Sequence, residues 1–260
     1  MKNSSMPDRI EILGVPVDCL SLREVTESIS QWLAEPAGTL RHIVTVNPEY
    51  VIAARRDSRF AETLRGAELA LADGIGIVLA ARLLRLTVPS RITGNDLVDA
   101  VAGMEYPGTR IFLLGAEPGV AEAAASVLRD RHPSAAIVGT LSGSPAPDGW
   151  QEISAALARS KPTILFVAFG HPRQDLWVSV NRARLEAHGI LVASGVGGVY
   201  DYLSGRVPRA PSLLRRFGLE WLYRLVRQPW RWRRQAALPV FTLLVILEAV
   251  RSRTGSGQAS

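Results

Sequence analysis

Short apolar runs alternate with longer amphipathic stretches along this sequence, and this alternation constrains the fold more than any other feature. We predict strands over residues 10–17 (a single strand or a hairpin around Gly14), 42–46, 69–72, 110–114, 135–138, 163–169 and 190–193. We predict helices over residues 21–34, from 48 onward, 75–84, 97–103, 115–131, 150–159 and 170–187. Strands that alternate with helices in this way favour a mostly parallel sheet with helices on both faces. We therefore predict an α/β fold.

Two helix starts carry clear local signals. Ser21 and Glu24 form the spacing of a capping box, in which each side chain bonds an amide that the helix start leaves without a partner. Asn47 followed by Pro48 combines a favoured cap with a favoured first helical residue.

The stretch 195–211 divides the chain into two parts of different character. Gly195, Gly197 and Gly198 permit unusual backbone angles and a close approach to a ligand, and charged residues follow them. An ordinary turn between a strand and a helix would also explain these glycines. Because an arginine- and tryptophan-rich segment follows, we predict a core over residues 1–205 and a basic, helical appendage over residues 206–260.

Positive charge is concentrated in that appendage. The net charge is +6, and residues 206–234 alone hold nine arginines and one acid, Glu220. Such a segment implies a phosphate-bearing or anionic partner. A nucleic acid is one candidate, because three nearby tryptophans could stack on bases. A membrane surface is the other, because the apolar run 236–247 follows. That run is interrupted by Pro239 and is shorter than the ~20 residues that span a bilayer.

The N-terminus and the cysteine content point to the cell interior. Residues 1–9 contain no apolar run, so we expect no signal peptide. Cys19 is the only cysteine, which excludes an intrachain disulfide and a cysteine-based metal cluster. We expect a protein that is cytosolic or bound to the inner face of a membrane.

Distinctive polar residues and glycines follow the carboxyl ends of the predicted strands. They are Thr45, Asn47, Asp73, Gly115, Gln174 and Asp201. In an open parallel sheet, ligands bind at this edge, where helix N-termini offer free amides and partial positive charge to phosphate. Each residue also has a local explanation, such as helix capping by Asn47. Their agreement across several strands favours a binding site.

Several other classes of site lack their sequence signatures. There is no Asp-x-Asp and no histidine pair with metal-ligand spacing, so we predict neither a metal nor a cofactor. The nucleophile elbow Gly-x-Ser-x-Gly and the phosphate-binding P-loop are absent. A nicotinamide-dependent oxidoreductase is disfavoured, because no Gly-x-Gly-x-x-Gly precedes an acid ~20 residues later.

Six segments in order resemble those of a known enzyme family. They are 45–49 (TVNPE), 72–76 (ADGIG), 91–97 (RITGNDL), 169–177 (FGHPRQDLW), 195–211 and 218–224 (GLEWLYR). Together they resemble the WecG/TagA/CpsF group, glycosyltransferase family 26. The resemblance covers residues 45–234 and departs at Asp175, where Glu would be expected.

The resemblance implies a Rossmann-like core and metal-independent, inverting transfer of a sugar. The donor would be a UDP-sugar and the acceptor a polyprenyl-diphosphate-linked saccharide, joined by a β-linkage at the cytoplasmic face of the inner membrane. Our first interpretation is transfer of a hexose in exopolysaccharide or other cell-surface polysaccharide synthesis. The alternative is transfer of N-acetylmannosamine or its uronic acid, as for teichoic acid or common antigen. A nucleic-acid-binding module remains the alternative of a different class, and a homo-oligomer is left open.

Roles for individual residues follow from the same resemblance. Asp73 would be the general base. The appendage arginines Arg224, Arg231 and Arg234 would stabilise the departing diphosphate, and their spacing places them on one face if the segment is a single helix. The substrate-binding residues would be Thr45, Asn47, Arg91, Asn95, Gly115, Gln174, Gly197 and Asp201.

Overall fold

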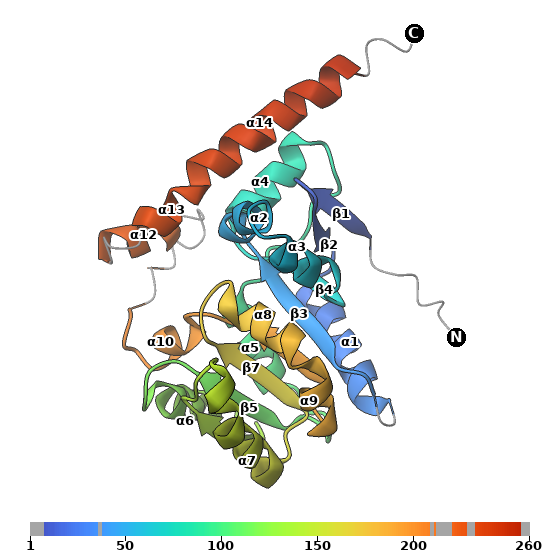
Figure 1. The fold of residues 1–260 in the computed structure, drawn as a ribbon. Helices are drawn as coiled ribbons and strands as arrows, with labels where there is room; N and C mark the ends of the chain where they lie inside the picture. The colour runs from blue at the N-terminus through green and yellow to red at the C-terminus, as the bar shows by residue number, and fades with distance from the viewer. Residues whose placement is uncertain (1–7, 36–37, 209–210, 212–219, 228–231, 256–260) are drawn as a thin grey trace.

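The computed structural model describes residues 8–35, 38–208, 211, 220–227 and 232–255. Its centre is a six-stranded parallel sheet in the order β4-β3-β8-β7-β5-β6 (Figure 1). A separate antiparallel hairpin is formed by β1 and β2. The strands are β1 (Arg9–Ile12), β2 (Val15–Asp18), β3 (Arg41–Val46), β4 (Leu69–Ala72), β5 (Ile111–Gly115), β6 (Ile137–Leu141), β7 (Ile164–Ala168) and β8 (Val192–Gly195). The predicted α/β fold is confirmed.

Side chains from successive strand residues enter different cores, one on each face of the sheet. In β7, Ile164 and Phe166 pack into the first core, whereas Leu165 and Val167 pack into the core behind the opposite face. This alternation follows from the two-residue period of a strand. Since both faces are buried, β4, β5 and β7 carry no polar side chain along their whole length, as is usual for parallel strands.

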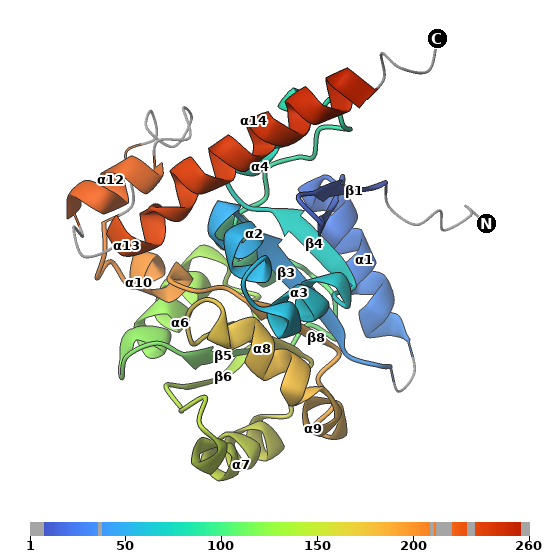
Figure 2. The ribbon, with the colours of Figure 1, turned by 45° about the horizontal axis from the view of Figure 1, so that its top comes forward.

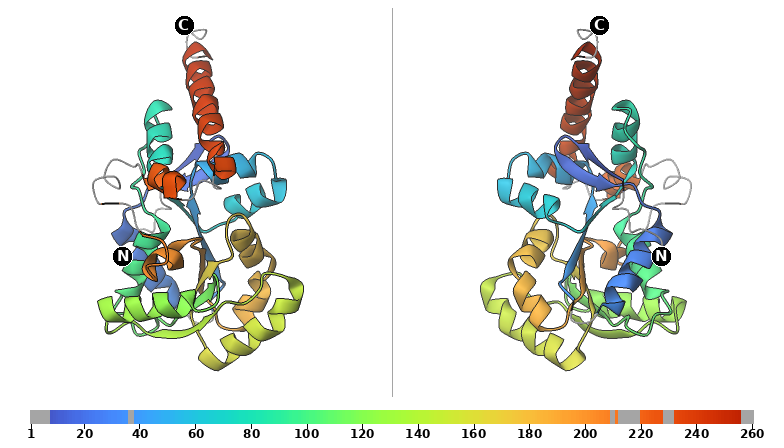
Figure 3. Two further views of the ribbon diagram at one scale, coloured as in Figure 1. Left: turned by 90° about the vertical axis from the view of Figure 1, so that its left-hand side faces the viewer. Right: turned by 90° about the vertical axis from the view of Figure 1, so that its right-hand side faces the viewer.

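Helices cover both faces, as Figure 3 shows in views along the sheet. The first face carries α1 (Leu22–Ala34), α5 (Gly94–Ala102), α6 (Val120–Arg131) and α10 (Val199–Leu203). The second face carries α2 (Pro48–Ala54), α3 (Ser58–Arg65), α7 (Trp150–Ser160), α8 (Arg173–Val180) and α9 (Arg182–Ala187). A further helix, α4 (Ile75–Leu83), packs with the β1–β2 hairpin near β4.

Most local predictions agree with the structure. The hairpin around Gly14 forms, and Ser21 and Glu24 make the capping box at the start of α1. Asn47 caps α2, where Pro48 is the first helical residue. The strand predicted over 135–138 is shifted to Ile137–Leu141, and neither α3 nor α10 was expected.

The helix predicted over residues 170–187 is interrupted. It forms two helices, α8 and α9, that meet at Asn181. The Asn181 side-chain amide donates to the carbonyl oxygen of Trp177 at 2.9 Å, alongside the backbone N–H of the same residue. An asparagine side chain that bonds the backbone in this way offers an alternative to continued helix. The prediction of one continuous helix was therefore wrong.

The described appendage is helical except at residues 206–208, 211 and 236, and its last helix packs on the core. Its described residues form three helices, α12 (Glu220–Arg227), α13 (Trp232–Gln235) and α14 (Ala237–Gly255). Phe241, Val245 and Ala249 are buried, and α14 lies along α2 and α4 (Figure 2). Pro239 is accommodated because it lies in the first turn, where no helical hydrogen bond is lost. Within the described ranges, every helix is too short or too polar to cross a bilayer.

Candidate active site

A cavity of about 250 Å³ opens at the carboxyl ends of the central strands. Residues that follow β3, β4 and β8 line it, together with the segment before α8 and two residues of the appendage, Gln235 and Leu238. This is the edge at which parallel α/β sheets bind ligands. We therefore take this cavity as the candidate active site.

Helix N-termini surround the cavity. The start of α4 contributes Gly74, Ile75 and Gly76, and the start of α5 contributes Gly94 and Asn95. Gly74, the residue before α4, has φ +98°, a conformation that favours glycine and lets the chain pass from β4 to α4 through only two residues. Free amides and the positive ends of helix dipoles favour anions, so the cavity suits the phosphates of a nucleotide.

Asp73 lies at the point where β4 meets α4. Its backbone N–H donates to the carbonyl oxygen of Val46 at 2.8 Å, which aligns the ends of β3 and β4. Its half-buried side chain belongs to the cavity lining. A carboxylate in this place can accept a proton from a bound hydroxyl group.

Gln174 is held in one orientation by two neighbours. Its Oε1 accepts the backbone N–H of Gly197 at 3.0 Å, and its Nε2 donates to the Tyr50 hydroxyl oxygen at 3.0 Å. Burial, followed by the charge of Asp175, raises the pKa of Tyr50 well above its usual value, so the phenol stays protonated. Gln174 is buried but still belongs to the cavity lining.

The structure brings most of the predicted site residues together, although they come from distant parts of the sequence. The residues that line the cavity are Thr45, Asn47, Asp73, Arg91, Asn95, Gln174 and Gly197. Their individual roles stay predictions. Sequence reasoning did not assign Tyr50, Thr93 or His171 to the site, although all three line it. Thr93 could have been found, because Thr93 and Asp96 have capping-box spacing and form that box at the start of α5.

Two residues predicted to bind substrate lie outside this lining. Gly115 ends β5 at φ +103°, and a Cβ there would stand 2.8 Å from the carbonyl carbon of Ala168 in β7. Because Gly115 has no side chain, β5 and β7 can approach each other closely at this point. Asp201 is half-buried in α10, where its carbonyl oxygen accepts the backbone N–H of Val207 at 2.9 Å. The structure does not bring either residue to the cavity.

The predicted appendage arginines are only partly described. Arg224 lies in α12 and Arg234 in α13, whereas Arg231 lies outside the described residues. The first two belong to different helices, so a shared face on one continuous helix is not shown. The appendage nevertheless reaches the cavity through Gln235 and Leu238.

A metal site is not visible in the part of the chain that is described. There, no three His, Cys, Asp or Glu side chains gather in a way that could hold an ion. Metal independence stays a prediction.

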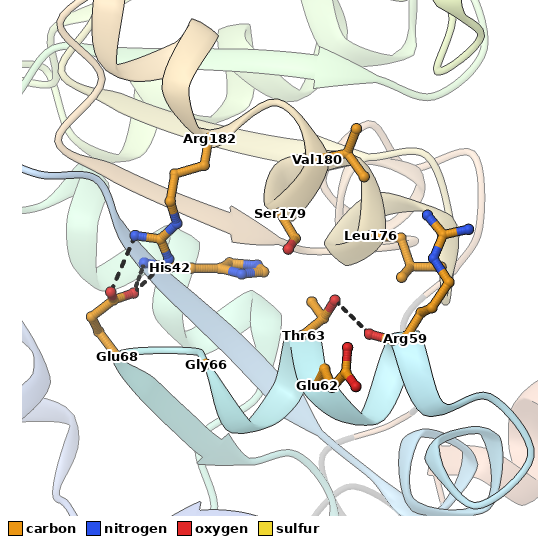
Figure 4. A pocket seen from close by; sticks show the side chains of 10 residues that line it. All are labelled: His42, Arg59, Glu62, Thr63, Gly66, Glu68, Leu176, Ser179, Val180 and Arg182. Carbon is orange, nitrogen blue, oxygen red and sulfur yellow. Dashed lines mark hydrogen bonds and ion pairs between the residues drawn. The ribbon is translucent and has the colours of Figure 1, made fainter.

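A second, larger cavity of about 530 Å³ lies away from the strand carboxyl ends (Figure 4). It lies between α3 and the end of α8, beside His42 near the start of β3. Arg182 and Glu68 at its edge form an ion pair at 3.1 Å. Because the cavity is distant from the converging helix starts, we do not take it as the active site.

Comparison with known proteins agrees with the geometry. The sequence profile of the family described as Glycosyl transferase WecG/TagA/CpsF family matches residues 10–255. A relative from Bacillus subtilis (strain 168) is 35% identical over 217 residues, covering 82% of this chain and 81% of the relative. One from Bacillus spizizenii is 37% identical over 206 residues, covering 78% of each chain. One from Staphylococcus aureus (strain MW2) is 30% identical over 234 residues, covering 90% of each.

All three relatives carry the name N-acetylglucosaminyldiphosphoundecaprenol N-acetyl-beta-D-mannosaminyltransferase. The profile covers nearly the whole chain, and five of the six segments that carry the resemblance in sequence contribute residues to one cavity. The chain therefore belongs to the WecG/TagA/CpsF family and is a glycosyltransferase.

Proposed function

We propose that this enzyme transfers N-acetylmannosamine from UDP-N-acetylmannosamine to N-acetylglucosaminyl-diphosphoundecaprenol. The observation that carries the proposal is the shared activity of the three relatives, each aligned over more than three quarters of its length. This is the alternative that the sequence analysis left open. It has better support than our first interpretation, hexose transfer in exopolysaccharide synthesis.

The proposed reaction inverts the configuration of the transferred sugar. Asp73 accepts the proton of the acceptor hydroxyl while the hydroxyl oxygen bonds to C1 of N-acetylmannosamine. The bond from C1 to the β-phosphate oxygen breaks on the opposite face, and its electron pair leaves with UDP. Thr45, Asn47 and Gln174 line the cavity where sugar hydroxyls would be held.

The departing UDP gains negative charge that the protein must stabilise. The amides at the starts of α4 and α5 supply part of this stabilisation. Arg91 is the one arginine among the described lining residues. We therefore propose that arginines of the appendage, Arg224, Arg231 and Arg234, complete the site, because neighbouring appendage residues already line it.

Peripheral attachment to a membrane surface would bring the enzyme to its lipid-linked acceptor. The outward side of α14 exposes Leu243, Ile246, Leu247 and Val250. Arginines precede this helix in the sequence. A basic segment beside an apolar helix face is typical of interfacial binding.

A donor screen tests the proposal. Purified enzyme is incubated with a short-chain N-acetylglucosaminyl-diphosphate lipid and one of three donors: UDP-N-acetylmannosamine, UDP-N-acetylmannosaminuronic acid or UDP-glucose. We expect a disaccharide product, detected by mass, and UDP release with the first donor only. NMR of the product should show the β-anomer. Faster transfer from UDP-glucose than from UDP-N-acetylmannosamine would contradict the proposal and support transfer of a hexose.

A further inference from the structure

A chain of buried polar side chains connects the active-site cavity to the interior of the second face. Gln174 donates to the Tyr50 hydroxyl at 3.0 Å, and the Tyr50 hydroxyl donates to Asp175 Oδ2 at 2.6 Å. Tyr50 is 3% exposed, Gln174 2% and Asp175 0%. The side chains come from α2 and α8, about 125 residues apart in sequence.

The donor and acceptor directions in this chain are fixed by chemistry. Asp175 lies in the first turn of α8, where the helix dipole favours a carboxylate. A carboxylate only accepts, so the phenol proton of Tyr50 points to Asp175 and the Tyr50 oxygen faces Gln174 as an acceptor. Gln174 must then present its NH₂ group to Tyr50 and its carbonyl oxygen to the N–H of Gly197, as observed.

A buried histidine lies near the far end of the chain but makes no hydrogen bond to it. His42 Nε2 lies 3.5 Å from Asp175 Oδ1, and both side chains are almost fully buried. This distance is longer than a typical hydrogen bond. Tyr50 is therefore the partner that holds Asp175 most closely. The His42 ring also lines the second cavity (Figure 4).

The backbone at Gly195 leaves room for the Gln174 and Asp175 side chains only because Gly195 has no side chain of its own. A Cβ added at Gly195 would stand 2.5 Å from Asp175 Oδ1 and 2.6 Å from Gln174 Nε2. Real Cβ atoms do not approach neighbours so closely, so the end of β8 must be glycine for both side chains to lie against it. The Tyr50 ring is also held in place, because it stacks on the His171 ring with the two ring centroids 4.4 Å apart.

We infer that Tyr50 and Asp175 are positioning residues that hold the Gln174 amide in its working orientation in the active site. One amide N–H of Gln174 remains to bind an oxygen of the substrate, and the bond to Gly197 fixes the backbone that follows β8. Without Tyr50, the amide could rotate and present its oxygen where the substrate needs a donor. The inference rests on the proposed function only for the choice of donor and acceptor in the assay.

The test is a double-mutant cycle on the full-length enzyme with the short-chain acceptor. Tyr50→Phe keeps the ring and its stacking but removes the hydroxyl, and Gln174→Ala removes the amide. We expect Tyr50→Phe to lower kcat at least tenfold in the wild-type background and less than twofold in the Gln174→Ala background, because Tyr50 acts through Gln174. KM for the donor should change less than kcat.

Tyr200→Phe is the matched control. Its hydroxyl is also buried and donates to the carbonyl oxygen of Phe166 at 2.8 Å, so its loss lowers stability in a similar way. It should leave kcat within twofold of the wild type. If Tyr50→Phe does not fold, Tyr50→Phe/Asp175→Asn replaces the unsatisfied carboxylate with a neutral amide and is measured instead.

The outcomes separate this inference from the proposed function. An active wild type whose kcat is unchanged by Tyr50→Phe overturns the inference and leaves the function intact. Equal effects of Tyr50→Phe in both backgrounds overturn it too, because Tyr50 would then act independently of Gln174. A wild type without activity on the proposed substrates contradicts the function, and the cycle is then repeated with whichever donor is active.

Discussion

The backbone N–H of Asp73 donates to the carbonyl oxygen of Val46 at 2.8 Å, and this bond sets the ends of β4 and β3 level with each other. The Asp73 carboxylate consequently shares a cavity with Asn47, the residue that follows Val46. The two strands supply the proposed base and a neighbouring hydrogen-bonding group from segments that are distant in sequence.

Replacement of Asp73 tests the proposed base. Asp73→Asn keeps the size of the side chain and removes its basicity. General base catalysis contributes ~10²–10⁴-fold, so turnover should fall by that factor while the melting temperature changes little. Asp99→Asn, at an exposed ion pair with Arg131, is the control and should retain full turnover. An Asp73→Asn enzyme with more than about a tenth of wild-type turnover excludes the role.

Metal independence is tested by chelation. Because the sequence lacks Asp-x-Asp, activity should survive an excess of EDTA, with helix amides and arginines stabilising the diphosphate. Turnover is measured before and after dialysis against the chelator, and again after addition of Mg²⁺ or Mn²⁺. Loss of activity that either ion restores would contradict the prediction.

Gly195→Ala should disturb the active site more than the fold. The added Cβ would push against Asp175 and Gln174, and overpacking of this kind costs about 1–3 kcal/mol. We expect kcat to fall at least tenfold, with a modest decrease in melting temperature. Gly38→Ala is the control, because a Cβ there meets Leu191 at an ordinary 3.4 Å. Equal kinetics for the two variants would show that Asp175 and Gln174 can move away from the added Cβ without loss of activity, which would contradict the prediction.

The two sides of α14 should respond differently to truncation. Phe241 is 3% exposed and packs with α2 and α4, so Phe241→Ala should lower the free energy of unfolding by about 3–5 kcal/mol. Leu243 is 57% exposed, so Leu243→Ala should leave stability unchanged and weaken binding to anionic lipid vesicles. Denaturant unfolding and vesicle sedimentation measure the two effects. Vesicle binding that is unaffected by Leu243→Ala would argue against this face as the membrane contact.

The appendage arginines should affect chemistry as well as attachment. If they only attract anionic lipid, each contributes ~1 kcal/mol near the surface, and turnover on a short-chain acceptor is unaffected by their loss. We expect instead that at least one of Arg224→Ala, Arg231→Ala and Arg234→Ala lowers that turnover by orders of magnitude with the fold unchanged. Normal kinetics for all three would make the appendage an anchor alone.

A fractionation experiment separates a membrane partner from a nucleic acid. Recovery of the protein with membranes should persist after nuclease treatment and disappear when lipid is extracted by detergent. Release by nuclease alone would favour the nucleic-acid-binding alternative, in which arginines and tryptophans of the appendage contact phosphates and bases.

The sequence by itself determined most elements of the fold and several of their boundaries. The cap at Ser21 and the Asn47–Pro48 start are interactions among residues three or four positions apart, so they are visible in the sequence and appear in the structure. The alternation of strands with helices predicted a mostly parallel sheet with helices on both faces. Parallel strands all end at the same edge of the sheet, so the sequence also predicted the edge at which Asp73 and Gln174 line one cavity.

Only the tertiary structure decided which of those residues share a cavity. Gly115 and Asp201 also follow strands, but packing places Gly115 against Ala168 and leaves Asp201 outside the lining. Tyr50 gives no local signal of a role, because its partner Asp175 lies 125 residues away and is reached only when α2 and α8 pack on the same face. Contacts of this kind depend on sheet order and helix packing, and neighbouring residues in the sequence do not encode them individually.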